Sequence, residues 1–145
     1  MDESKYGKYI ITEINKPGEK QDWSASYRPQ DKMELLHLDD DVIKGAFYVQ
    51  AGWFWPAITE NPSADRSTKP HKHTYDEVIG IVGTNPDDPR DLCGEIEMYL
   101  GGEKHIINKS CVIFLPAGLE HGPFRELRVD RPIFHFDVGM SKKHT

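Results

Sequence analysis

Short runs of hydrophobic residues are separated by polar residues along most of this chain. No window keeps the i, i+3, i+4, i+7 spacing of apolar residues for three turns, so helices of ordinary length are not expected. The apolar runs are short, rich in branched and aromatic residues, and bounded by Gly, Pro, Asn or Asp, which is typical of β-strands. We expect strands at Tyr9–Ile14, Met33–Leu38, Ala46–Ala51, Val78–Val82, Glu95–Leu100, His105–Ile107, Val112–Leu115 and Ile133–Val138.

Several short strands joined by turns predict an all-β sandwich or barrel. A length of 145 residues fits one domain, so residues 1–145 are assigned to a single unit with its barrel core at 46–138. Polar loops are expected at Thr59–Pro70 and Asn85–Asp91. Residues 1–45 look less regular, and we expect them to form edge strands and an N-terminal arm laid across the barrel or a partner.

The charge balance disfavours one class of partner. Lys and Arg number 18 against 24 Asp and Glu, giving a net charge of −6, and no basic run offers a surface for nucleic acid. No apolar stretch approaches the roughly 18 residues of a membrane span. The first residues are followed by no apolar run, so no signal peptide is expected and the cytoplasm is the expected location. Cys93 and Cys111 share no pairing pattern and are expected to be free thiols.

The first segment that could bind a metal ion is Pro70–Glu77, with the sequence PHKHTYDE. In a strand, residues i and i+2 point to the same face about 6.6 Å apart, so His71 and His73 can converge on one ion. Glu77 has the same parity if no bulge intervenes. Two imidazoles and one carboxylate form a set that suits Fe(II) and leaves coordination positions open.

A second segment can supply a third imidazole. In Phe114–Gly122, Pro116 and Gly118 predict a turn after an apolar strand, and His121 then begins the next element. A histidine delivered from a different strand can complete the coordination shell.

Together the two segments resemble the cupin superfamily. Its first motif, G-x5-H-x-H-x3,4-E-x6-G, is matched by His71, His73 and Glu77, whereas Asp65 holds the opening glycine position and Gly83 comes one residue early. The resemblance covers roughly residues 46–138.

The second cupin motif, G-x5-P-x-G-x2-H-x3-N, is matched by Pro116, Gly118 and His121, with Ser110 and Arg125 in place of the opening glycine and final asparagine. The resemblance implies a cupin-type β-barrel, also called a double-stranded β-helix or jelly roll. It also implies one divalent transition metal ion per chain (Fe, Mn, Zn or Ni). The implied ligands are His71, His73, Glu77 and His121. The competing interpretation is a barrel whose histidines only form hydrogen bonds in a polar core.

Three further residues are catalytic candidates, each with a structural alternative. Tyr75 is an even number of residues from His71, His73 and Glu77, so in a strand it would point to the same face. Its side chain is expected either to face the cavity or to pack in the core of the barrel. Arg125 clamps a substrate carboxylate or lies on the surface. Glu77, if it swings off the ion, becomes a general base.

Other chemistry-bearing residues are expected to be structural. We expect Glu97 on the surface, and core packing rather than a pocket wall for Trp53, Phe54 and Trp55. Four other histidines receive no role in the site: His37, His105, His135 and His144.

Three functions fit these observations. The first is a metal-dependent enzyme, a dioxygenase, decarboxylase or isomerase, acting on a small molecule such as a diketone, enol or carboxylate. The second is a small-molecule or sugar-binding barrel without turnover, and the third is a storage-like or structural barrel. A homodimer is expected because exposed strand edges are usually paired or covered, with Tyr9–Ile14 as the candidate strand that joins the partner's sheet.

Overall fold

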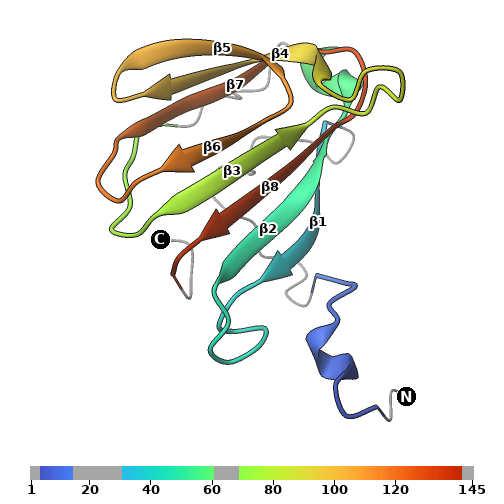
Figure 1. Cartoon of the computed structure of the whole chain (residues 1–145), viewed down its shortest axis with the longest axis vertical. Coiled ribbons are helices and arrows are strands. Elements are labelled where there is room, and N and C mark those ends of the chain that lie inside the picture. The colour runs from blue at the N-terminus through green and yellow to red at the C-terminus, as the bar shows by residue number, and fades with distance from the viewer. Residues whose placement is uncertain (1–3, 15–30, 61–68, 142–145) are drawn as a thin grey trace.

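Two antiparallel sheets build this protein, whose computed structural model describes residues 4–14, 31–60 and 69–141 (Figure 1). The five-stranded sheet has the order β1-β2-β8-β3-β6, and the three-stranded sheet has the order β5-β4-β7. Two short 3-10 turns, η1 (Gly7–Tyr9) and η3 (Pro56–Glu60), accompany the strands. The strands are β1 (Lys32–Leu38), β2 (Tyr48–Phe54), β3 (Glu77–Val82), β4 (Asp91–Leu100), β5 (Glu103–Lys109), β6 (Cys111–Leu115), β7 (His121–Val129) and β8 (Ile133–Gly139).

The all-β prediction is confirmed, and most predicted strands lie within or overlap observed ones. The predicted strand Tyr9–Ile14 is wrong. Residues 7–9 form η1, closed by hydrogen bonds from the Tyr9 and Ile10 amides to the carbonyls of Tyr6 and Gly7, and residues 10–14 are not in a strand. Strand β7 begins at His121, where the sequence predicted a new element, but its extent was not predicted because charged residues interrupt its apolar pattern at Arg125, Glu126 and Arg128.

An apolar core fills one end of the space between the sheets. Phe54 belongs to it, as the expected core packing of the aromatic run requires, whereas Trp53 points to the opposite face of β2 and stacks on Trp55 with ring centroids 5.4 Å apart. The buried core residues are Phe54, Ile58, Ile81, Leu92, Ile96, Val129 and Ile133.

The other end of the inner face is polar. Strand register places Gln50 beside Asp137 and His37, and Tyr48 opposite Gly139, which in turn is opposite Glu77. All of these positions share the face that carries Phe54 and Ile133 further along the strands. The interior is therefore divided between an apolar core and a polar region, and the candidate metal ligands border the polar region.

Two smaller expectations concern the thiols and membranes. Cys93 and Cys111 are free and half-buried. Within the ranges that the structure describes, no helix is long and apolar enough to cross a membrane. The predicted loop Thr59–Pro70 and the terminal His144 lie wholly or partly outside the described residues.

Candidate metal centre

Backbone hydrogen bonds fix two of the candidate ligands side by side. His71 and His121 form an isolated antiparallel bridge, in which each amide donates to the other residue's carbonyl at 2.9 and 2.8 Å. The turn before β7 adds a third tie, since the Gly118 amide donates to the His73 carbonyl at 2.8 Å. Gly118 has φ +87°, a conformation in which a Cβ is strained, which explains the glycine after Pro116.

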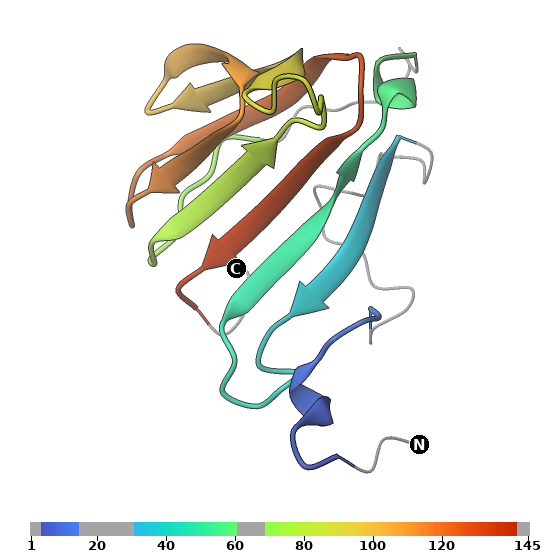
Figure 2. The same ribbon diagram turned by 45° about the vertical axis from the view of Figure 1, so that its right-hand side comes forward.

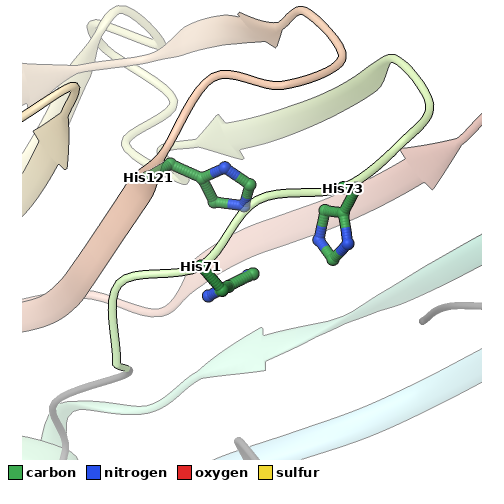
Figure 3. Close-up of side chains that lie close together, drawn as sticks. All are labelled: His71, His73 and His121. Atoms are coloured by element: carbon green, nitrogen blue, oxygen red, sulfur yellow. The ribbon is translucent and has the colours of Figure 1, made fainter.

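The three imidazoles converge on one space (Figure 3). The ring centroids lie 5.0 Å apart for His71 and His73, 4.3 Å for His71 and His121, and 5.2 Å for His73 and His121. One ligand nitrogen from each ring lies within 4.8 Å of the others. Residue parity predicted that His71, His73 and Glu77 lie on one continuous strand. Instead, β3 begins only at Glu77, and the chain bends between His73 and Glu77.

Two of the rings are oriented for metal binding. The Nδ1 atom of His71 lies 2.8 Å from the Lys69 carbonyl, and that of His121 lies 3.1 Å from the Leu119 carbonyl. A carbonyl only accepts, so Nδ1 carries the proton and donates, which leaves the Nε2 lone pair for an ion. Nitrogens bound at about 2.1 Å to one ion are roughly 3.0–3.4 Å apart, so a small inward rotation of the rings completes the fit. The His71, His73 and His121 set can therefore hold a divalent transition metal.

Glu77 lies against the same histidines. Its Oε1 atom is 3.4 Å from His121 Nε2 and 3.7 Å from His73 Nε2, and the side chain is buried. Burial disfavours the ionised carboxylate, but its contacts with His121, Asp137 and His73 outweigh burial and lower the pKa of Glu77 to about 2. Glu77 therefore contributes a negative charge beside His73 and His121.

Asp137 shares a proton with Glu77. Burial, the negative charge of Glu77 and the hydrogen bond to it raise the pKa of Asp137 well above its usual range. Two carboxylates in contact cannot both be ionised cheaply, and the one beside the imidazoles is the one that stays charged. Asp137 therefore holds its proton, and its other oxygen, Oδ1, is buried without a hydrogen-bond partner in the described structure.

A cation and an amide lie further along the same inner face. The Lys32 ammonium lies 4.9 Å from the centroid of the Phe54 ring, and burial lowers its pKa to about 7 against the opposing attraction of Glu126, Asp137 and Glu34. Gln50 is paired in register with Asp137, and its buried Nε2 atom has no hydrogen-bond partner in the described structure. Sequence reasoning missed these groups, because they come from strands far apart in the chain and match no spacing motif.

The remaining candidates lie at different distances from the site. Tyr75 is buried and stacks on His73, with ring centroids 4.8 Å apart. Arg125 points away from the core on β7, and its Nη1 atom contacts Glu97 Oε2 at 3.4 Å. Glu97 lies on the outer side of the three-stranded sheet as expected, but the expected exposure is wrong, because Arg125 and Lys104 cover its carboxylate. Arg125 therefore lies outside the candidate metal centre.

His37 closes the polar inner face at β1. Its Nδ1 atom lies 3.2 Å from Glu34, and its Nε2 atom lies 3.0 Å from Asp39. Hydrogen bonding to Glu34 raises the pKa of His37, and Asp39 adds to this effect against the opposing influence of burial. The folded state therefore favours the protonated imidazole more than the unfolded state does.

This raised pKa predicts a pH-dependent contribution to stability. The contribution is complete below the unfolded pKa of roughly 6.5 and is lost as pH rises through the higher folded pKa. We expect His37→Gln to lower the free energy of unfolding by about 1 kcal/mol near pH 5.5, and by less at pH 8.5. Urea unfolding of chelator-treated protein at both pH values measures this, with His105→Gln on the exposed face of β5 as the control. A deficit that does not change with pH contradicts the prediction.

Comparisons with known proteins find this architecture in solved structures. No family model matches the sequence, and no curated protein matches it. An oxalate oxidase solved with the substrate analogue glycolate has a TM-score of 0.53 and 14% identity, over 94% of this chain and 61% of that chain. This chain thus spans less than two thirds of the oxalate oxidase.

Two smaller proteins align over more of their own length. An RmlC-like cupin from Shewanella frigidimarina has a TM-score of 0.46 and 13% identity, over 77% of each chain. KdgF from Halomonas sp. has a TM-score of 0.44 and 20% identity, over 92% of this chain and 94% of that chain. At such identities the comparisons concern the fold alone. The likeness to the oxalate oxidase, whose TM-score is above 0.5, shows a shared fold, and the two antiparallel sheets fit the architecture that the two sequence motifs led us to expect.

Proposed function

We propose that this cupin-fold chain is a metal-dependent enzyme acting on a small organic molecule by oxygenase- or lyase-type chemistry. The observation that carries the proposal is the set of three converging imidazoles, two of them with Nδ1 directed to a backbone carbonyl. These histidines would hold one Fe, Mn, Zn or Ni ion, with Glu77 as the fourth ligand. When bound, such an ion supplies Lewis acidity toward substrate oxygens.

The inner-face residues favour a substrate rich in oxygen atoms. The Gln50 amide can donate a hydrogen bond, whereas Asp137, whose proton is directed to Glu77, offers its Oδ1 atom as an acceptor. Below its pKa of about 7, the Lys32 ammonium adds a positive charge that suits a carboxylate or enolate oxygen. A diketone, an enol or a carboxylate offers the acceptor oxygens that this set can bind and orient, and the neighbouring apolar core can take the carbon skeleton.

Metal analysis and a substrate screen test the proposal. Protein purified without added metal is expected to carry about one first-row divalent ion per chain. A panel of diketones, enols and small carboxylates is then assayed for O₂ consumption, CO₂ release and substrate loss. Metal-dependent turnover of any member supports the proposal, and loss of turnover on chelation is the control. Binding of panel members without turnover would instead establish the alternative, a non-catalytic small-molecule or sugar-binding barrel.

The role of Lys32 gives a sharper test of substrate binding. Glycolate, which is bound in the oxalate oxidase of similar fold, serves as a first carboxylate probe. We expect Lys32→Met to leave the metal content unchanged and to weaken glycolate binding about tenfold or more, because it removes one charge-assisted hydrogen bond. Isothermal titration with the metal-loaded protein measures this. Lys104→Met, which removes an exposed lysine on the outer face, should bind as the wild type does, and equal binding by both variants contradicts the role of Lys32.

A further inference from the structure

Lys32 carries its amine into the protein. It is the first residue of β1, the edge strand of the five-stranded sheet (cyan in Figure 2). The register pairs Lys32 with Phe54, and directly paired residues of antiparallel strands share a face, so Lys32 points to the inner side with the buried Phe54. Its Nζ atom lies 4.9 Å from the centroid of the Phe54 ring. A lysine on an edge strand ordinarily extends its charged end into water, and this one does not.

Charged and titratable groups from three strands face this amine. Burial lowers the pKa of Lys32 to about 7. Three acidic residues oppose this effect without cancelling it, namely Glu126 on β7, Asp137 on β8 and Glu34 on β1. On the same inner face, burial and the positive charge of Lys32 lower the pKa of His135. Near neutral pH a large share of Lys32 is therefore the neutral amine, whereas a lysine in water is almost entirely protonated.

Two buried polar atoms on the same face point to a bound molecule. Gln50 is 1% exposed, and its Nε2 atom has no hydrogen-bond partner among the described residues. The Oδ1 atom of Asp137, which is paired with Gln50 in register, is also buried and has none in the described part of the chain. Leaving such groups unpaired costs stability, and a ligand that supplies the missing partner removes the cost. A carbonyl oxygen accepts the hydrogen bond that Gln50 can donate.

We propose that Lys32 is a nucleophilic amine that condenses with a carbonyl group of a small ketone, above all a 1,3-diketone, bound on this inner face. The nitrogen lone pair attacks the carbonyl carbon, the π electrons of the C=O bond move to oxygen, and transfer of a proton from nitrogen to oxygen gives a carbinolamine. The C–O bond then breaks, the oxygen takes up a second proton and leaves as water, and a protonated imine remains.

Glu126 is the residue that can exchange these protons. It is buried on β7 in the opposite sheet, in register with the core residue Ile96, so its carboxylate faces the interior. It also exerts the largest of the three attractions on the Lys32 ammonium. The condensation uses no metal, oxidant or reductant, so this activity is separate from the metal-dependent function proposed above.

A 1,3-diketone suits both the chemistry and the surroundings. The imine loses a proton from the carbon between the two former carbonyl groups, which gives an enaminone conjugated with the second carbonyl. Conjugation protects this product from hydrolysis and makes it absorb in the near ultraviolet, so it is trapped without a reductant. The second carbonyl oxygen can accept a hydrogen bond from Gln50, and the buried Phe54 ring offers an apolar contact for the carbon skeleton.

Acetylacetone is the probe that tests the proposal. Intact-mass spectrometry of the protein as purified, at about pH 7.5, should show a gain of one diketone less one water per chain, and peptide mapping should place it on Lys32. At this pH the fraction of neutral amine is roughly several hundred times larger for a pKa of about 7 than for the model value of 10.5. We expect Lys32 to react at least about tenfold faster than any other lysine, since a less basic amine is also a weaker nucleophile.

The pH profile identifies the reacting amine. The rate at Lys32 should level off above about pH 7, where its neutral fraction is complete, whereas the rate at exposed lysines should keep rising toward about pH 10. Lys32→Met should abolish the adduct. Lys104→Met is the matched control, because the Lys104 side chain is 55% exposed and contacts Glu97 on the outer face, and this variant should react as the wild type does.

Two checks make the outcome independent of folding and of the metal. Circular dichroism shows whether each variant is folded, and peptide mapping of the wild type locates the adduct without any substitution. Chelator-treated protein should form the same adduct at the same rate, so the reaction succeeds or fails separately from metal-dependent turnover. An adduct confined to exposed lysines, an adduct that requires bound metal, or no adduct at all overturns the proposal.

Discussion

The His73→Ala variant is expected to lose at least nine-tenths of the metal that the wild type carries. His73 is one of two buried members of the triad. It stacks on Tyr75 and lies 3.7 Å from the Glu77 carboxylate, so its loss removes one donor and loosens a second. Even residues that only support a ligand change metal affinity by about 10–100-fold, and a direct ligand should cost at least as much. Inductively coupled plasma mass spectrometry of protein purified without added metal measures the content.

His105→Ala is the matched control for that loss. His105 is exposed on β5 and contacts Glu103 at 3.0 Å, on a strand that carries none of the three histidines. The control should keep the wild-type metal content. If the double variant His71→Ala, His73→Ala still binds a full complement of metal tightly, the three-histidine assignment is wrong.

Glu77→Gln should separate two roles for this carboxylate. The pKa of Glu77 is lowered to about 2, so the group is charged at every ordinary assay pH and the substitution removes a full negative charge at nearly constant shape. As a ligand, Glu77 lowers the net charge of an ion surrounded by neutral imidazoles. We therefore expect the variant to bind metal about 10–100-fold more weakly and to change its preference among Fe, Mn, Zn and Ni.

The alternative role gives a different result. If Glu77 is a general base beside the substrate, Glu77→Gln keeps the metal and loses turnover. Metal affinity from competition with a chelator and turnover under saturating metal distinguish the two. The control for the loss of one charge elsewhere is Glu95→Gln. Glu95 on β4 is half-exposed and forms an ion pair with Arg128. A Glu77 variant unchanged in affinity, selectivity and turnover would reduce the site to the three histidines.

The candidate metal ligands could be predicted from the sequence because they lie in two short segments with characteristic spacings. His71 and His73 are two residues apart, and Pro116 and Gly118 predict the turn that precedes His121. These short spacings are enough to indicate a metal site. The predicted geometry was less accurate. Residue parity placed the first ligands on one strand, whereas the backbone bridge to His121 and the bend before β3 bring them together.

The inner and outer faces of the five-stranded sheet could not be read in this way. Lys32, Gln50 and Asp137 come from three strands, and only the pairing register shows that they share a face. Alternation in β8 likewise shows two sets of residues, Phe134, Phe136 and Val138 against His135 and Asp137, but not which set faces inward. A general rule would place the aromatic residues inside, and between Phe134 and Val138 of β8 the rule is reversed. The burial of Glu97 could not be predicted for the same reason. Alternation along β4 alone assigns its carboxylate to the surface, but neighbours on other strands cover it.

The backbone bridge between His71 and His121 has a consequence for experiments with different metals. In small zinc domains the ion itself organises the ligands, so removing it unfolds the chain. Here four atoms of main chain, two amides and two carbonyls, already fix the spacing of two ligands, and the β7 ladder holds one of them independently of any ion. Demetallation should therefore yield a folded apoprotein. One preparation can then be reconstituted in turn with Fe, Mn, Zn and Ni, so that differences in reactivity report on the ion rather than on refolding.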